Sequence, residues 1–181
     1  MSFCPCRLCR SYVTVFKTLG TYWHIYGGFP ALLCSPYLFG AVIITGACYP
    51  LWKEKEWWDI VLAVVPSVAG FALGGYAVLL AFGGEKFASI FAGKRNENES
   101  SPFMDVNAAF VHFIVVNTIS IFYALITKAW EFENTYVNAF GFCLFVYGLL
   151  TSVAATFAIF FMSEMFDLYA TPKSEPKDFQ K

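Results

Sequence analysis

One apolar stretch of the sequence, residues 106–127, contains a single histidine, His112, and no Asp, Glu, Lys or Arg. Asn107, Asn117 and Ser120 lie in the same stretch. Ionisable residues inside a membrane segment are functional candidates by default. A histidine near an asparagine can relay a proton or line a narrow aqueous path. The alternative is a neutral histidine that is hydrogen-bonded to a neighbouring helix. We favour this second interpretation, because buried polar groups are normally paired.

Three cysteines near the N-terminus form a second candidate for chemistry. The sequence "CPCRLC" places Cys4, Cys6 and Cys9 close together. Structural zinc sites use paired C-x2-C spacings in two distant halves, and only Cys6 and Cys9 have that spacing. Lipid attachment to these thiols would require a eukaryotic host. The pattern therefore assigns these cysteines no role, and we predict neither a metal site nor a cofactor.

Residue patterns typical of enzymes are missing from the sequence. His24 and His112 lie in different regions, and there is no HExxH, GxSxG or phosphate-binding glycine loop. Glu164 and Asp167 lie one helical turn apart, but we expect them to face solvent outside any enclosed site. We therefore predict that the chain is not an enzyme.

The composition predicts an all-α protein embedded in a membrane. Of the 181 residues, 58% are hydrophobic and 14% are charged, whereas a soluble domain has about 25% charged residues. A spanning helix needs about 20 mostly apolar residues. Four segments meet this need, at 29–52, 57–82, 106–127 and 137–162. The first contains three prolines, which should kink it or break its first turn.

The basic residues predict an orientation in the membrane. Nine flank one side of the predicted spans, and the other three are Lys53, Lys55 and Lys128. The nine are Arg7, Arg10, Lys17, Lys86, Lys94, Arg95, Lys173, Lys177 and Lys181. Because short cytoplasmic loops are rich in Lys and Arg, both termini should be cytoplasmic. Tryptophans 52, 57, 58 and 130 should then lie at the outer interface.

This orientation divides the chain into three predicted regions. Residues 1–28 form a cytoplasmic or interfacial N-terminal segment. Residues 29–163 form a four-helix transmembrane domain with a cytoplasmic loop at 83–105, and residues 164–181 form a cytoplasmic tail. Within the first region, "SYVTVFKTLGTYWHIY" could lie at the membrane surface with its aromatic rings at headgroup depth. It could equally be an irregular lead-in to the first span.

Small residues line one face of the second predicted span and one face of the fourth. The two sets are Ser67, Gly70, Gly74, Gly75 and Ala77, and then Gly141, Gly148, Ser152 and Ala155. In lipid, helices associate through close packing, which small side chains permit. The two faces are candidates for helix–helix contact, either within one chain or between copies.

The predicted cytoplasmic segments are too short to hold a catalytic domain. Any downstream activity would therefore have to come from a partner protein. The candidate docking surface combines apolar and charged residues: Phe87, Ile90, Phe91, Lys94, Arg95, Glu164 and Asp167. Apolar anchors would give affinity, and the charges would set specificity. The net charge of −1 offers no basic surface for direct nucleic-acid binding.

The sequence "VPSVAGFALGGYAVLLAFGGEKF", within residues 57–87, and the four-span plan resemble the membrane subunit of the Kiwa anti-phage system. The resemblance implies a homotetramer in the bacterial inner membrane that senses phage attack at the envelope. It also implies a separate cytoplasmic effector that binds DNA. The resemblance identifies no functional site residue in this sequence. Two alternatives stay open: a membrane-disrupting defence effector of the retron type, and a small channel or transporter with His112 and Asn117 lining its path.

Overall fold

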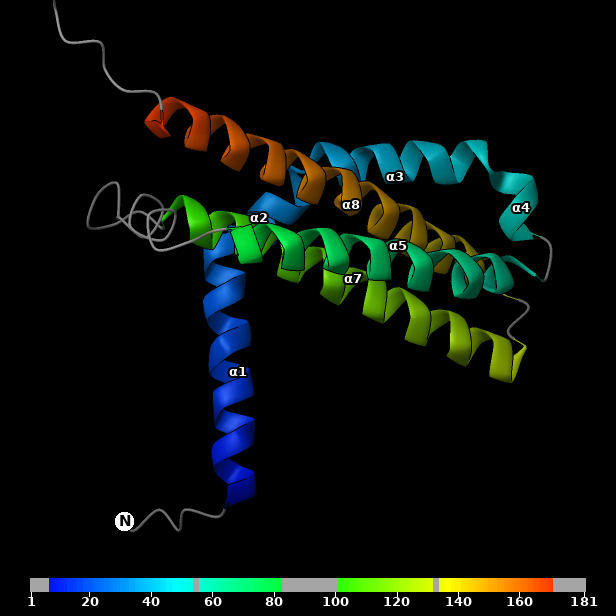
Figure 1. Cartoon of the computed structure of the whole chain (residues 1–181). Helices are drawn as coiled ribbons and strands as arrows, with labels where there is room; N and C mark the ends of the chain where they lie inside the picture. The colour runs from blue at the N-terminus through cyan, green and yellow to red at the C-terminus, as the bar shows by residue number, and fades with distance from the viewer. Residues whose placement is uncertain (1–6, 54–55, 83–100, 132–133, 171–181) are drawn as a thin grey trace, which may run out of the picture.

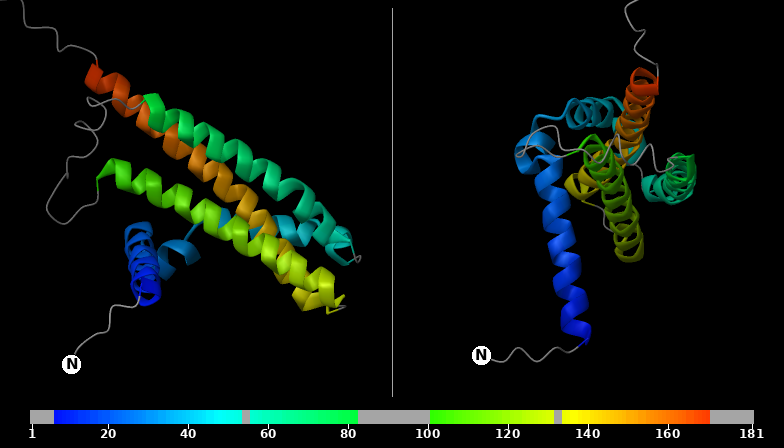
Figure 2. Two further views of the ribbon diagram at one scale, coloured as in Figure 1. Left: turned by 60° about the horizontal axis from the view of Figure 1, so that its bottom comes forward. Right: turned by 60° about the vertical axis from the view of Figure 1, so that its left-hand side comes forward.

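A bundle of three long helices forms the body of the molecule. The computed structural model describes residues 7–53, 56–82, 101–131 and 134–170, and every regular element within these ranges is an α-helix. Helices α5 (Trp57–Phe82), α7 (Pro102–Trp130) and α8 (Thr135–Ala170) run alongside one another (Figures 1 and 2). Each is long and apolar enough to cross a membrane. The prediction of an all-α chain with membrane-spanning helices is confirmed to this extent.

The described residues contain three helices of spanning length, so the prediction of four is corrected. The predicted span at 29–52 is divided into α2 (Gly28–Leu33), α3 (Pro36–Ala47) and α4 (Tyr49–Lys53). Proline disfavours helical backbone in the residue before it, and Ser35 accordingly has extended angles, φ −68° and ψ 126°. At 1.5 Å per residue, α3 is about 18 Å long, well short of the roughly 30 Å hydrocarbon core of a bilayer.

Helix α3 packs along part of α8 (Figure 1). Ala41 and Thr45 of α3 are buried. A Cβ atom added at Gly40 would lie 3.3 Å from Leu150 of α8. The Trp52 ring N–H donates to the Thr45 carbonyl at 2.7 Å. This contact folds α4 back against the end of α3.

Helix α1 (Arg7–Tyr26) points away from the bundle and crosses its direction steeply (Figures 1 and 2). Two glycines make this change of direction possible. Gly27 and Gly28 have φ values of 97° and 66°, in the left-handed region that side chains disfavour. A Cβ atom at Gly27 would also lie 2.9 Å from the Ala31 Cβ.

The core of the bundle has two apolar clusters. The first contains Trp52, Trp57, Trp58, Val61, Val65, Val116, Phe142, Phe145, Val146 and Tyr147, with Ala41 of α3 and Ala124 of α7. The second lies nearer the start of α7 and contains Val106, Phe110, Phe113, Ala155 and Met162. Both clusters include residues of α7 and α8, so these two helices form the centre of the fold.

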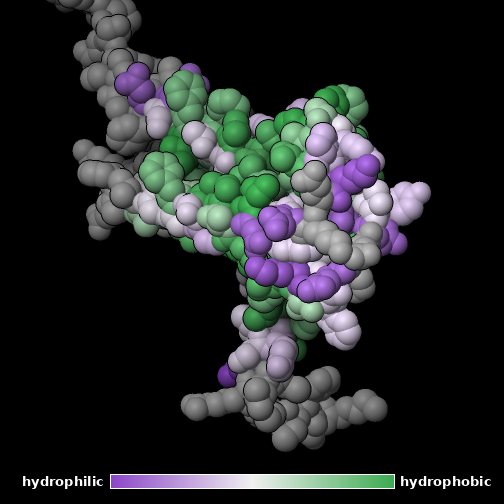
Figure 3. Space-filling model, turned by 90° about the vertical axis from the view of Figure 1, so that its right-hand side faces the viewer, coloured by the Kyte–Doolittle hydropathy of each residue, from purple (hydrophilic) through white to green (hydrophobic). Residues whose placement is uncertain are grey.

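The ends of the long helices carry polar and charged groups. Helix α7 begins at Pro102, and the Ser101 hydroxyl accepts the Met104 N–H at 3.4 Å. A serine followed by proline is a typical start of a helix. At the opposite end of the bundle, Lys128 forms an ion pair with Asp59 at 2.6 Å. Hydrophilic residues gather over this end, and hydrophobic residues cover the side of the bundle (Figure 3).

Candidate functional site

His112 lies at the centre of a cluster with three tyrosines, which we call the histidine cluster: Tyr22, Tyr26, His112 and Tyr147. The Tyr22 hydroxyl lies 2.7 Å from the imidazole Nδ1, and the Tyr147 hydroxyl lies 2.7 Å from Nε2. The Tyr26 ring stacks on the imidazole at a centroid distance of 3.9 Å. The histidine is only 4% exposed. Both ring nitrogens therefore have partners from other helices.

Three helices position the histidine cluster. Tyr22 and Tyr26 lie four residues apart, on one face of the last turns of α1. His112 comes from α7 and Tyr147 from α8. Among the described residues, α1 makes its polar contact with the bundle through this cluster. The cluster therefore fixes the point at which the crosswise helix is attached.

The cluster forms a continuous chain of hydrogen-bonding groups. A neutral imidazole has one N–H donor and one lone-pair acceptor, so one tyrosine donates to the ring and the other accepts from it. The Tyr147 hydroxyl lies 3.4 Å from the Tyr26 hydroxyl, which extends the chain. Burial, together with the neighbouring Tyr26, raises the pKa of Tyr22 to about 12. Tyr22 is therefore a neutral phenol at physiological pH.

Asn117 lies one turn and a half further along α7 and is 1% exposed. Its amide N–H₂ donates to the Phe113 carbonyl at 2.8 Å and to the Gly148 carbonyl of α8 at 3.2 Å. A Cβ atom at Gly148 would lie 2.8 Å from the Asn117 Oδ1, so glycine permits this contact. The Asn117 Oδ1 and the buried Ser120 hydroxyl have no hydrogen-bond partner among the described residues.

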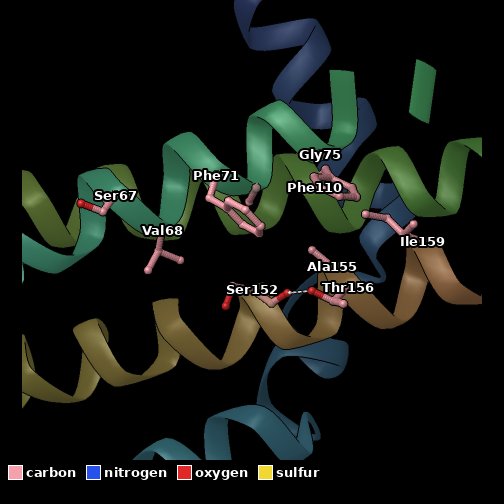
Figure 4. Close-up of a pocket in the computed structure, with 10 residues that line it drawn as sticks. Ser67, Val68, Phe71, Gly75, Phe110, Ser152, Ala155, Thr156 and Ile159 are labelled. Atoms are coloured by element: carbon pink, nitrogen blue, oxygen red, sulfur yellow. Dashed lines mark hydrogen bonds between the residues drawn. The ribbon is translucent and has the colours of Figure 1, made fainter. Parts of the chain in front are cut away.

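A groove of about 430 Å³ opens between α5 and α8, with Phe110 of α7 at its base. It is lined by Ser67, Val68, Phe71, Ala72, Gly75, Phe110, Ser152, Ala155, Thr156 and Ile159. Figure 4 shows that the lining side chains come from α5 on one wall and from α8 on the other. The Thr156 hydroxyl donates to the Ser152 carbonyl at 2.9 Å, so this polar side chain is satisfied within its own helix.

The two small-residue faces have different surroundings. On α5, Gly70, Gly74 and Gly75 are exposed, and a Cβ atom at any of them would meet nothing within 4 Å. On α8, Gly148 packs on Asn117. A Cβ atom at Gly141 would run into the Trp57 ring and lie 2.6 Å from Tyr123. Ser67 and Ser152 line the groove. The α8 glycines therefore serve packing within the chain, while the α5 glycines face outward.

The candidate docking residues fall mostly outside the described part of the chain. Phe87, Ile90, Phe91, Lys94 and Arg95 belong to the segment 83–100, which the structure does not describe. Glu164 and Asp167 are exposed near the end of α8. This helix continues to Ala170, beyond the predicted end of the fourth span.

Sequence reasoning singled out His112 but missed its three tyrosine partners. A usable signal was present, because Tyr22 and Tyr26 have the four-residue spacing that places two side chains on one helix face. Tyr147 had a signal too, because it is the only tyrosine in the predicted span 137–162, where every other aromatic residue is a phenylalanine. A tyrosine hydroxyl inside an apolar segment needs a polar partner.

Comparisons of the chain with protein-family models, with curated proteins and with solved structures give no match.

Proposed function

We propose that the chain is a non-enzymatic component of the bacterial inner membrane, which assembles as a homo-oligomer and anchors or activates a cytoplasmic effector. Three helices of spanning length support the membrane location. The observation that carries the assembly is the open side of α5, where a Cβ atom added at Gly70, Gly74 or Gly75 would meet no described residue within 4 Å. Such a surface lets another helix approach closely, which is the main source of helix association in lipid.

The groove beside these glycines gives a second copy a place to pack. Phe71, which is 86% exposed, lies at its edge on α5. A helix from a second copy would cover Phe71 and fill the space between α5 and α8. The resemblance to the Kiwa membrane subunit implies a homotetramer.

Substitution of Gly74 by leucine tests the assembly. Gly74→Leu should separate helices that meet at this face and lower the mass of the particle in native mass spectrometry of nanodiscs. Gly46→Leu is the matched control, because Gly46 on α3 is equally exposed and also has nothing within 4 Å of its missing side chain. A Gly74→Leu particle with the parent mass would exclude this face as the oligomer interface.

A phage-defence role predicts a cytoplasmic partner. The test is purification of the tagged protein from its native host, with residues 171–181 removed or with Phe87 and Phe91 changed to serine. These changes should remove a stoichiometric cytoplasmic protein from the purified complex. Glu56→Gln, at the opposite end of the bundle, should leave it bound. If no such protein accompanies the parent chain, the anchoring role is wrong.

A small channel is the second candidate, and two unpaired polar atoms favour it. The buried Asn117 Oδ1 and Ser120 hydroxyl have unused hydrogen-bonding capacity, which a water molecule or an ion could use. The measurement is ion flux through the pure protein in liposomes. Flux that Asn117→Leu abolishes would support the channel. Flux that this variant leaves unchanged would instead favour a membrane-disrupting effector.

A further inference from the structure

Helix α1 has two unlike faces along its whole length. Arg10, Thr14, Lys17 and Thr21 recur at spacings of four and three and form a polar face. Tyr12, Val15, Phe16 and Leu19 form the opposite, apolar face, which continues into Tyr22 and Tyr26. Thr14 and Thr21 donate to the carbonyls of Arg10 and Lys17 on their own helix, at 2.9 and 3.0 Å.

Within the described part of the chain, other residues cover only the last turns of this apolar face. Tyr22 and Tyr26 contact His112 in the histidine cluster. The rest of the face is open, with Phe16 70% exposed and Tyr12 63% exposed. A row of large apolar side chains in water would be costly, and the cost grows with the apolar area that is exposed. Something other than water must therefore cover the face.

The direction and depth of α1 indicate what covers it. Helix α1 crosses the spanning helices steeply (Figures 1 and 2), so it runs along the membrane plane when they run across the membrane. His112 is nine residues after Phe103, where the spanning stretch begins, or about 14 Å along the helix at 1.5 Å per residue. The spanning stretch Phe103–Trp130 has 28 residues and exceeds a 30 Å hydrocarbon core by about 6 Å at each end. The attachment point of α1 is therefore about 8 Å below the hydrocarbon edge, within the roughly 5–10 Å at which surface helices lie.

The charge of α1 matches an anionic leaflet. The helix contains no Asp or Glu, and the exposed Arg10 and Lys17 share its polar face. Basic side chains near an anionic membrane surface are attracted to it. Lysine and arginine also have long stems that reach headgroups while the helix lies deeper.

We infer that α1 is a membrane-surface helix that inserts the face formed by Tyr12, Val15, Phe16 and Leu19 into an anionic leaflet, with the histidine cluster fixing its inner end to the bundle. The partner is the lipid itself: acyl chains against the apolar face, and phosphate headgroups against Arg10 and Lys17. This inference does not depend on the proposed assembly or on an effector.

Spin-label accessibility in the full-length protein tests the inference directly. The six native cysteines are replaced, and single cysteines are introduced as Phe16→Cys or Leu19→Cys on the apolar face and Thr14→Cys or Thr21→Cys on the polar face. The protein is reconstituted in vesicles of phosphatidylcholine with about one quarter of anionic phosphatidylglycerol. Collision with oxygen reports lipid exposure, and collision with a water-soluble nickel complex reports water exposure. The cysteine-free protein must retain the elution volume and thermal unfolding of the parent.

Lipid, water and protein against the apolar face each predict a different accessibility of the labels. The inference expects labels at 16 and 19 to collide with oxygen, at a depth of about 5–10 Å, and labels at 14 and 21 to collide with the nickel complex. Nickel access at all four positions would place α1 in water and overturn the inference. Protection of positions 16 and 19 from both reagents would mean that a protein surface covers them, and would overturn it equally.

The anionic requirement is tested with lipid and charge together. In vesicles of phosphatidylcholine alone, and in the variant with Arg10→Glu and Lys17→Glu, the label at 16 should be shallower than in the parent with phosphatidylglycerol. The variant with Thr14→Glu and Thr21→Glu is the control. It adds negative charge to the same face but keeps Arg10 and Lys17. An unchanged depth without anionic lipid would overturn the recognition of anionic headgroups.

Discussion

At the scale of single residues, His112 and Gly148 show how polar and small groups are accommodated in an apolar bundle. The imidazole has a tyrosine hydroxyl at each nitrogen, from α1 on one side and α8 on the other. Gly148 lets Asn117 bond across to the backbone of α8. Both arrangements tie α7 to its neighbours through polar contacts, which apolar side chains in lipid cannot replace.

Replacement of His112 by phenylalanine should destabilise the fold. His112→Phe keeps a ring that can stack on Tyr26 but leaves the hydroxyls of Tyr22 and Tyr147 without their partner. The expected loss is about 1–3 kcal/mol of unfolding free energy, measured by unfolding in mixed micelles. Tyr22→Phe and Tyr147→Phe complete a double-mutant cycle with it. Equal stability of His112→Phe and the parent would contradict a structural role for the cluster.

Alanine substitutions should separate the two kinds of glycine. At Gly148 the new Cβ atom would lie 2.8 Å from the Asn117 Oδ1, so Gly148→Ala should displace Asn117 and cost about 1–3 kcal/mol. A Cβ atom at Gly74 would meet no described residue within 4 Å, and Gly74→Ala should leave the stability of the single chain unchanged or raise it by up to about 1 kcal/mol. Thermal unfolding of the two variants side by side is the measurement. A larger loss at Gly74 than at Gly148 would reverse our assignment.

The raised pKa of Tyr22 predicts alkaline sensitivity of the α1 attachment. A tyrosine whose pKa is about 12 in place and 10.0 when free stabilises the attached form below pH 10. That contribution is lost as the pH rises through 12, because the free phenol ionises first. The difference between the phenolate absorbance titrations of the parent and of Tyr22→Phe should have its midpoint near 12. A midpoint near 10 would show that Tyr22 is not buried against His112.

At the scale of helices, the three long apolar segments were predictable from length and composition. Residues 57–82 coincide with α5, and the predicted spans at 106–127 and 137–162 lie inside α7 and α8. The division of the segment 29–52 into short helices was not predictable in this way. Its hydropathy resembles that of a span, but Pro36 and Pro50 interrupt its backbone. Local backbone restriction outweighs hydrophobic length there.

The tryptophans show a similar limit of the sequence signal. Trp130 is 74% exposed, as an interface residue would be, but Trp57 is 1% exposed. The Trp57 ring N–H donates to the Asn138 Oδ1 of α8 at 3.1 Å. An indole needs an apolar surface and one acceptor, and a neighbouring helix can supply both as well as a membrane interface can. Sequence alone does not distinguish these environments.

The ion pair between α5 and α7 should contribute little to stability. Lys128 and Asp59 are 50% and 53% exposed, and exposed pairs are typically worth about 0–1 kcal/mol. Lys128→Ala should therefore lower the unfolding free energy by no more than this, with an effect that shrinks as salt is added. Lys53→Ala is a suitable control at the same end of the bundle. A loss well above 1 kcal/mol would mean that the pair is shielded from solvent in the assembled protein.

At the scale of the whole molecule, the sequence indicated the membrane class and one member of the histidine cluster. It could not indicate the attachment of α1, because Tyr22 and His112 are 90 residues apart and no local pattern connects them. The open groove was also beyond prediction. The small-residue stripes of α5 and α8 looked alike as sequence, and only their packing partners distinguish them.

Reporter fusions test the orientation of the chain. The excess of basic residues predicts that the N-terminus and Lys181 lie in the cytoplasm and that a fusion after Glu54 lies outside. The N-terminal fusion is the informative one, because α2, α3 and α4 must together cross the membrane for both ends to share a side. An N-terminus on the same side as the fusion after Glu54 would show that this broken segment does not cross.

The crosswise direction of α1 also has a consequence for the shape of the surrounding bilayer. A helix of 20 residues is about 30 Å long and 10 Å wide, so lying flat it displaces roughly 300 Å² of lipid from one leaflet. Helices α3 and α4, at the other end of the bundle, run with the spanning helices or cap them (Figure 1), and add little area to the opposite leaflet. With α1 inserted as inferred, the molecule takes up more area in one leaflet than in the other, and it should be enriched where the leaflet that holds α1 is convex.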